Sequence, residues 1–328
     1  MRVCLVGEYS GNIDEGVRQV ASSLYGELSR NHKVLNLDIR TIFRFTTWND
    51  ARNFKPAIIH YLLGPSFLSL IVTRLLSVYC GGAKTIVSAI MPSIPHFLQK
   101  FIFLVRPDMI LTQSREAEAR FAGLGCRVAF LPNGIDVEKF RPASKEQRDR
   151  LREKYGVDKG KYVILHVGSI KRKRNLYILK NLQTSNNQVL IIGSTSMKAE
   201  SEVYSQLQSS GVQIWRTYFD NINEIYALAD CYLFPVRKTT AAIEMPLSIM
   251  EAMACNLPVI STRFGALPRV FEEGDGLFFV DQGDEFLDKI QAIKQGKVSV
   301  RTREKVLPYS WQEVTRRLEE IYNEVISH

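Results

Sequence analysis

Short apolar runs alternate along the chain with longer segments whose apolar positions recur at helical spacing. Such runs predict buried strands, and the segments between them predict helices. Strands separated by helices predict parallel sheets with helices on both faces, which is an α/β fold. The predicted strands are Val3–Val6, Lys33–Leu37, Ala57–Tyr61, Lys84–Val87, Met109–Thr112, Val128–Leu131, Tyr162–Val167, Gln188–Ile192, Val212–Trp215, Cys231–Phe234, Pro258–Ser261 and Gly276–Val280.

The alternation occurs twice, on either side of a charged stretch at 137–156 that we interpret as a hinge. We therefore expect two Rossmann-like domains, at 1–150 and 151–310, that face each other across a cleft. The last segment, 311–328, is expected to be a helix that packs back across the cleft toward the first domain. Ligands of open α/β sheets bind beyond the carboxyl ends of the strands, so the cleft is the expected site. The predicted helices include Gly16–Ser29, Arg115–Ala122, Asn221–Leu228, Pro246–Ala254, Asp284–Gln295 and Trp311–Ser327.

Composition limits the class of protein. A chain of 328 residues with 45% hydrophobic and 23% charged residues is typical of a globular protein with two domains. The five cysteines are scattered, odd in number and never in C-x-x-C spacing, which argues against disulfides or zinc and favours a cytoplasmic protein. The five histidines are dispersed, so no metal site is expected, and the chain begins as a strand rather than as a signal peptide.

The net charge of +9 favours acidic partners such as nucleotide diphosphates or phospholipid headgroups. No nucleic-acid-binding motif accompanies the charge, so nucleic acid is not an expected partner. No run reaches the roughly 18 apolar residues of a spanning helix. Two apolar segments, 61–73 and 94–104, are either core helices or, with their basic residues, a surface that rests on an anionic membrane.

The segment 235–259 carries the most specific chemical signal. Pro246 suits the first position of a helix, and the residues after it are apolar except for Glu251. A carboxylate among apolar residues is costly unless hydrogen-bond donors reach it. Because a helix start also attracts phosphate, we expect a nucleotide pocket with ribose hydroxyls on Glu251 and phosphates on the amides near Leu247 and Ser248. The alternative is a surface helix whose Glu251 points to water.

A second signal follows the strand Tyr162–Val167. Gly168 and Ser169 come directly after it, four cations occupy 171–174, and a helix is expected from Asn175. Glycine allows a ligand to approach the backbone, and the cations can neutralise phosphate oxygens. The alternative is a solvated run of charge. His166, within the strand, is interpreted as a core residue.

These and other motifs together resemble the retaining, nucleotide-sugar-dependent glycosyltransferases of family 4. The resemblance covers most of the chain and is strongest from 128 to 282. Its specificity comes from the order and spacing of the motifs. The matching segments are 15–18 (Glu-Gly-Val-Arg), 131–136 (Leu-Pro-Asn-Gly-Ile-Asp) with Phe140 and Pro142, 167–170 (Val-Gly-Ser-Ile) with Arg174, 227–230 (Ala-Leu-Ala-Asp), Phe234-Pro235 and 251–260 (Glu-Ala-Met-Ala-Cys-Asn-Leu-Pro-Val-Ile).

The resemblance implies the GT-B fold and transfer of a sugar from a UDP- or GDP-sugar, with no cofactor and no essential metal. It implies attack on the same face as departure, and an acceptor that is a glycan or a lipid-linked sugar. We expect a cytoplasmic protein, either free or peripheral at the inner face of the membrane. The catalytic residues implied are Arg174 and Glu244. The substrate-binding residues implied are Glu251, Gly168, Ser169, Lys171, Met245, Pro246, Leu247 and Ser248, with Glu15 and Gly16 on the acceptor side.

Two departures from the family pattern leave alternatives open. The family has two glutamates eight positions apart, whereas this chain has Ile243 at the first position and Glu244 beside it. A basic residue usually follows the glycine of the phosphate loop, where this chain has Ser169. The alternatives are a non-catalytic protein that binds a nucleotide sugar, and an epimerase of nucleotide sugars on the same fold. An epimerase would need acidic and histidine side chains around the sugar, which the sequence does not present.

Overall fold

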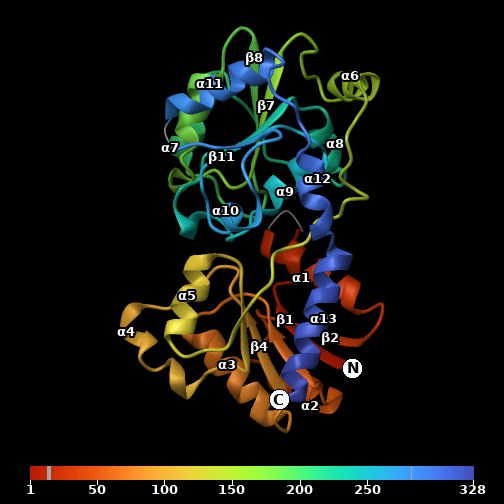
Figure 1. The fold of residues 1–328 in the computed structure, drawn as a ribbon, viewed down its shortest axis with the longest axis vertical. Helices are drawn as coiled ribbons and strands as arrows, with labels where there is room; N and C mark the ends of the chain where they lie inside the picture. The colour runs from red at the N-terminus through yellow and green to blue at the C-terminus, as the bar shows by residue number, and fades with distance from the viewer. Residues whose placement is uncertain (13–15, 282) are drawn as a thin grey trace. The chain divides into compact units, whose positions relative to one another are not determined.

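The computed structural model describes residues 1–12, 16–281 and 283–328 (Figure 1). The chain divides into two compact units, and each contains a six-stranded parallel sheet. The amino-terminal unit comprises Met1–Gly134, Ile243–Met245 and Trp311–His328, and the carboxyl-terminal unit comprises Ile135–Ala242 and Pro246–Ser310. The predicted α/β fold class is confirmed. The expected domain limits at 150 and 310 stay predictions, because compact units do not test which parts fold on their own.

The amino-terminal sheet has the strand order β2-β1-β3-β4-β5-β6. Its strands are β1 (Arg2–Gly7), β2 (Lys33–Asp38), β3 (Ile58–Tyr61), β4 (Lys84–Ser88), β5 (Met109–Thr112) and β6 (Val128–Phe130). Its helices are α1 (Gly16–Leu28), α2 (Phe45–Phe54), α3 (Phe67–Tyr79), α4 (His96–Gln99), the 3-10 helix η1 (Ile102–Leu104), α5 (Arg115–Gly123) and α13 (Trp311–Ser327).

The two faces of this sheet are covered by different helices, because successive strand residues point to opposite faces. Cys4 and Val6 of β1 pack with residues of α2 and α3. Ile110 of β5 packs with residues of α3, the segment 94–105 and α5. On the face opposite α2 and α3, α13 contacts His60 of β3. The helices α1 and α13 also contact each other.

The helix α13 completes the amino-terminal unit, as the sequence predicted. The Tyr322 hydroxyl lies 2.7 Å from Nδ1 of His60, and the Ser88 hydroxyl lies 2.7 Å from its Nε2. Burial lowers the pKa of His60 to about 3. At the start of the helix, Trp311 packs so closely on Gly134 that a Cβ at residue 134 would overlap the indole ring.

The carboxyl-terminal sheet has the strand order β12-β11-β10-β7-β8-β9. Its strands are β7 (Tyr162–Val167), β8 (Asn187–Ile192), β9 (Gln213–Trp215), β10 (Cys231–Phe234), β11 (Val259–Ser261) and β12 (Leu277–Phe279). Its helices are α6 (Lys145–Lys154), α7 (Ser201–Ser209), α8 (Ile222–Ala227), α9 (Leu247–Ala254), α10 (Leu267–Val270), α11 (Gly283–Lys294) and α12 (Thr302–Val306), with the 3-10 helices η2 (Arg172–Arg174), η3 (Leu176–Leu182), η4 (Thr239–Ala241) and η5 (Leu307–Tyr309).

The charged stretch interpreted as a hinge contains a folded helix, α6, within the carboxyl-terminal unit. Ser144 and Gln147 form a capping box at its start. Arg152 is buried and binds Asp230 at 2.7 Å, and Arg148 binds the other oxygen of this carboxylate at 2.8 Å. The stretch is charged and yet folded, because both arginines pair with Asp230. Its role as a hinge stays a prediction.

Every predicted strand is present, within two residues of its expected ends. The helix expected from Asn175 is a correction: Asn175 has a φ of 58°, and the turns on either side of it are 3-10 helices. The left-handed conformation of Asn175 separates η2 from η3, and the residues after it form a 3-10 helix instead of the expected α-helix. The helix expected from Pro246 begins one residue later, at Leu247.

Candidate functional site

The loop after β7 is shaped by a glycine and a buried arginine. Gly168 has a φ of +147°, and a Cβ at this position would collide with the guanidinium of Arg174. A side chain is therefore excluded on both steric and conformational grounds. Ser169 beside it is buried, and the loop turns through η2 to bring Arg174 back toward Gly168.

Arg174 lies in the interior of the carboxyl-terminal unit with 6% of its surface exposed. Its Nη1 donates to the Ala241 carbonyl at 3.2 Å, and its guanidinium lies 5.4 Å from the centre of the Phe234 ring. Burial, followed by the nearby charge of Arg174, lowers the pKa of His166 to about 3. The imidazole is therefore neutral, and the positive charge of this region belongs to the arginine.

The other three cations of the loop have different surroundings. Arg172 is exposed and pairs with Glu202. Lys173 is exposed and donates to the Thr240 carbonyl. Lys171 is half-buried, and its carbonyl accepts from the Arg174 N–H at 3.0 Å. Arg174 is thus the one buried side chain among the four.

Glu251 is buried in α9, as its apolar neighbours predicted, with 5% of its surface exposed. The hydroxyl of Tyr226, on α8, donates to its carboxylate at 2.6 Å. Burial, followed by the negative charge of Glu251, raises the pKa of Tyr226 well above its usual value, so the hydroxyl keeps its proton. The interpretation of Glu251 as a solvated surface residue is excluded by its burial.

Tyr232 of β10 connects the loop after β7 with the start of α9. Its hydroxyl lies 3.4 Å from the Val167 carbonyl, at the end of β7, and hydrogen-bonds the Ser248 side chain in the first turn of α9. The loop at 168–174 and the amino-terminal end of α9 therefore lie side by side in one unit. This brings together the predicted residues Gly168, Ser169, Lys171, Arg174, Pro246, Leu247, Ser248 and Glu251.

Glu244 and Met245 belong instead to the amino-terminal unit. The Glu244 carboxylate accepts from the Ser114 N–H at 3.1 Å, at the amino-terminal end of α5. Its own N–H donates to the Ile90 carbonyl at 3.0 Å. The Met245 carbonyl accepts from the Asn133 side chain at 2.8 Å. These hydrogen bonds hold the segment 243–245 on the amino-terminal unit.

Ile243, which replaces the family's first glutamate, serves as packing. It is 7% exposed, and its Cδ1 would lie 3.1 Å from a Cβ at Gly16, so glycine at the start of α1 leaves room for it. Glu15, expected on the acceptor side, lies outside the described residues.

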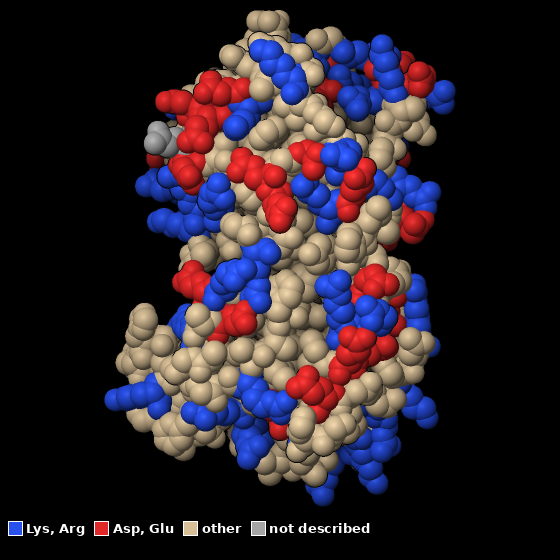
Figure 2. Space-filling model, in the orientation of Figure 1, with Lys and Arg blue, Asp and Glu red and all other residues tan. Residues whose placement is uncertain are grey.

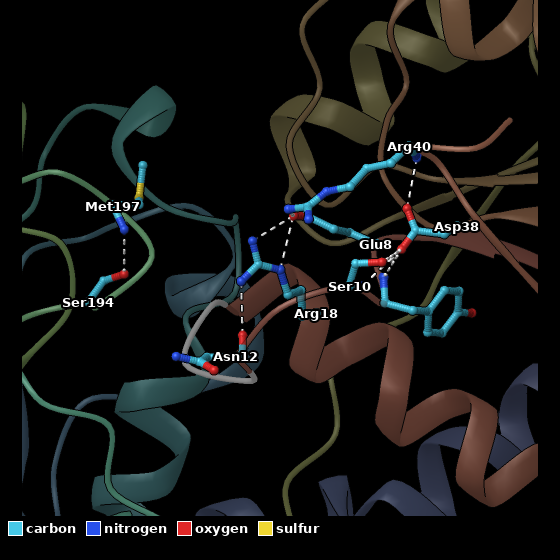
Figure 3. A network of polar contacts seen from close by, with 9 residues as sticks. Glu8, Ser10, Asn12, Arg18, Asp38, Arg40, Ser194 and Met197 are labelled. Carbon is cyan, nitrogen blue, oxygen red and sulfur yellow. Dashed lines mark hydrogen bonds and ion pairs between the residues drawn. The ribbon is translucent and has the colours of Figure 1, made fainter. Parts of the chain in front are cut away.

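A polar network occupies the carboxyl ends of β1 and β2 (Figure 3). Glu8 accepts from Arg18 at 2.7 Å and from Arg40 at 2.9 Å. Asp38 accepts from the Ser10 hydroxyl at 2.6 Å. Burial favours a higher pKa for Asp38, but hydrogen bonds from the Ser10 hydroxyl and from backbone N–H groups, including that of Arg40, leave this pKa below its usual value.

The family comparison decides the class of the carboxyl-terminal unit. Residues 161–295 match the family described as glycosyl transferases group 1. These residues form a group 1 glycosyltransferase domain. The glycosyltransferase domain contains both segments joined by Tyr232, and the resemblance drawn from the motifs is confirmed.

The curated relatives that the chain matches are named as glycosyltransferases. A sulfoquinovosyl transferase of Arabidopsis thaliana is 24% identical over 304 residues, which are 82% of this chain and 57% of that protein. A D-inositol 3-phosphate glycosyltransferase of Arthrobacter sp. (strain FB24) is 28% identical over 177 residues, which are 49% of this chain and 40% of that protein. The matched regions thus span about half the length of these relatives.

Solved structures show the same fold over the whole chain. A glycosyltransferase from Rickettsia africae ESF-5 has a TM-score of 0.76 at 14% identity, with 100% of this chain and 99% of that one covered. Anabaena HepE in complex with UDP-glucose has a TM-score of 0.74 at 14% identity, with 99% of this chain and 100% of that one covered. The predicted GT-B class is confirmed by these neighbours.

Several residues of these sites were missed from the sequence. Tyr226 directly precedes the recognised segment 227–230, and Tyr232 lies in a recognised strand, but neither signal shows where a hydroxyl points. The signal for Glu8 and Asp38 was available, because each lies where a predicted strand ends. Ser114 follows β5 by two residues and could have been found in the same way.

Proposed function

We propose that the chain transfers a sugar from a UDP- or GDP-sugar to an acceptor hydroxyl with retention of configuration, without an essential metal. The observation that carries the proposal is that buried Arg174 and buried Glu251 lie on the two segments that Tyr232 joins, in a region that matches the group 1 glycosyltransferase family. A buried cation and a buried carboxylate beside a helix start match the two ends of a nucleoside diphosphate.

In the proposed donor site, Glu251 accepts hydrogen bonds from ribose hydroxyls. The Tyr226 hydroxyl holds the carboxylate through one of its oxygens. Arg174, Lys171 and the amides near Leu247 and Ser248 bind the diphosphate. Gly168 and Ser169 allow the phosphates to approach the backbone. Stabilising the leaving diphosphate is the main source of rate in this proposal, because charge develops there in the transition state.

In the proposed acceptor site, the polar network of the amino-terminal unit binds hydroxyl groups. Glu8, Asp38 and Arg40 offer acceptors and donors at the carboxyl ends of adjacent strands, where α/β sheets bind ligands. Glu15 and Gly16 stand next to this network in the sequence. The acceptor class we propose is a glycan or a lipid-linked sugar, as in the relative named phosphatidylinositol monomannoside mannosyltransferase.

The test has two stages, because binding and transfer are separate properties. Thermal-shift measurements with UDP- and GDP-sugars identify the donor, and a ligand at a hundred times its Kd is expected to stabilise the protein by about 2.7 kcal/mol. Transfer to lipid-extract or glycan acceptors is then followed in EDTA, and the anomeric configuration of the product is read by NMR. An inverted product, or activity abolished by EDTA, contradicts the mechanism.

One observation favours a second function. Because Ile243 fills the space against Gly16, the family's first glutamate has no counterpart at that position. A protein that binds a nucleotide sugar without transferring it fits this observation. It predicts stabilisation by a nucleotide sugar with no turnover in any acceptor extract.

A further inference from the structure

The exposed side of the amino-terminal unit over α2, α3 and the segment 94–105 is unusually apolar. Leu68, Leu75 and Val78 of α3 are 54–64% exposed and recur along one side of the helix. Arg74 is the only charged residue of α3, whereas an ordinary surface helix presents several on its outer side. The opposite side of α3 is buried against the sheet.

The segment 94–105 and the start of α2 continue this surface. Phe97, Phe103 and Leu104 are 59–69% exposed. Phe43 and Phe45, at the start of α2, are each 72% exposed. The buried sides of both segments pack with residues of α3, on the same face of the sheet. Many exposed apolar side chains over one face of a sheet mark an interaction surface.

Basic residues outnumber acidic residues in this region of the sequence. Between residues 39 and 107 the chain has eight lysines and arginines and a single acid, Asp50. Two of these cations pair with acids outside this range, Arg40 with Glu8 and Lys84 with Asp108. Exposed cations, among them Arg44, Arg74 and Lys100, lie between the apolar residues in the sequence. Figure 2 shows lysine and arginine side chains among uncharged residues at the lower edge of the amino-terminal unit, with acidic side chains above them on the same face.

We infer that this surface, defined by Phe43, Phe45, Leu68, Leu75, Val78, Phe97, Phe101, Phe103 and Leu104 with Arg44, Arg74, Lys100 and Arg106, docks reversibly on an anionic lipid bilayer. Apolar side chains enter the headgroup boundary, and the cations attract the phosphate groups around them. Within the described residues no helix is both long and apolar enough to cross a bilayer.

A second copy of the chain is the competing occupant. In a two-fold dimer the same surface faces itself, so Arg74 and Lys100 would face cations of the partner with almost no acid to neutralise them. A lipid bilayer containing anionic headgroups removes this repulsion. The charge pattern therefore favours lipid over self-association. Docking on a bilayer is a property separate from the proposed sugar transfer, because it can be measured without a sugar donor or acceptor.

The experiment is flotation of the full chain with vesicles of phosphatidylcholine, alone or with one-quarter phosphatidylglycerol, at low and high salt. We expect binding to the anionic vesicles at low salt that weakens at high salt. Arg74→Gln with Lys100→Gln is expected to weaken partitioning roughly 30-fold, about fivefold for each cation. Phe97→Ser and Phe103→Ser are each expected to weaken it on the order of tenfold.

Matched controls lie in the carboxyl-terminal unit. Leu307→Ser removes an apolar side chain of 44% exposure, and Arg150→Gln removes an exposed cation. Both are expected to leave flotation unchanged. Circular dichroism and thermal shift with nucleotide sugar check that every variant is folded, and they separate a failure of docking from a failure of the donor site.

Three results would overturn the inference. The first is a wild-type chain that does not float with anionic vesicles at low salt. The second is an equal loss of flotation in the control and surface variants. The third is sedimentation of the wild type as a dimer that the surface variants convert to a monomer, which would assign the surface to self-association.

Discussion

At the scale of single residues, the pair Tyr226–Glu251 makes a prediction about binding. Glu251→Ala is expected to weaken nucleotide-sugar binding about tenfold to a hundredfold, because hydrogen bonds to a charged group contribute about 1.5–3 kcal/mol. Calorimetric titration measures the change. A variant that binds as tightly as the parent would remove Glu251 from the donor site.

Tyr226→Phe tests whether the Tyr226 hydroxyl orients the Glu251 carboxylate without itself contacting the nucleotide. Because the phenylalanine cannot donate to buried Glu251, the free energy of unfolding is expected to fall by about 1–3 kcal/mol. Nucleotide binding is expected to weaken less than in Glu251→Ala. Tyr218→Phe, at an exposed tyrosine, is the matched control and should change neither quantity. Denaturant unfolding and titration of the three variants provide the comparison.

The basic loop gives a second prediction at this scale. Arg174→Ala is expected to lower kcat/KM by about 10²–10³, the range for removing one donor to a developing charge. Lys171, Arg172 and Lys173 variants should each lose less than tenfold, because none of these side chains is buried. Arg174→Lys tests the guanidinium itself, since lysine keeps the charge without the fork of donors. Equal small losses at all four positions would indicate a solvated charge run.

At the scale of elements, the segment 243–245 predicts the effect of restoring the family's glutamate. Ile243→Glu places a carboxylate against Gly16 in a buried position, so we expect the free energy of unfolding to fall by about 3 kcal/mol without a gain in activity. Ile243→Leu, a change of shape only, should cost less than about 1.5 kcal/mol. Higher activity in the glutamate variant would show that position 243 still faces the reacting sugar.

The strands could be predicted from the sequence because buried parallel strands leave continuous apolar runs, such as Tyr162–Val167. The burial of Glu251 followed from its apolar neighbours for the same reason. The helices were harder to predict. The helix α6 is highly charged, and its Arg152 is buried because it pairs with Asp230, which is distant in the sequence. The contacts of Glu244 could not be predicted, since they depend on Ser114 and Ile90, which are distant in sequence.

At the scale of the whole molecule, two buried histidines predict the dependence of stability on pH. His60 and His166, one in each unit, have folded pKa values of about 3, against 6.5 without burial. The unfolded chain therefore binds protons first as the pH falls, and stability is present above pH 6.5 and is lost between 6.5 and 3. The slope approaches about 1.4 kcal/mol per pH unit for each histidine.

Thermal unfolding between pH 7.5 and 5 measures this slope. His60→Gln retains hydrogen-bonding groups but cannot titrate, so it should remove about half of the slope. His96→Gln, at an exposed histidine of the amino-terminal unit, should leave the slope unchanged. A slope unaffected by His60→Gln would mean that the acid lability arises from other groups.

The return of α13 to the first sheet has a consequence for the order in which the protein is made. Residues 1–134 leave the ribosome long before Trp311–Ser327. The face of the sheet around His60 is therefore uncovered while the carboxyl-terminal unit is synthesised. The part made first is therefore finished last. Until α13 emerges, the nascent amino-terminal sheet lacks the helix that buries Trp311, Leu318 and Tyr322 within this unit. Such transiently exposed apolar surface favours aggregation.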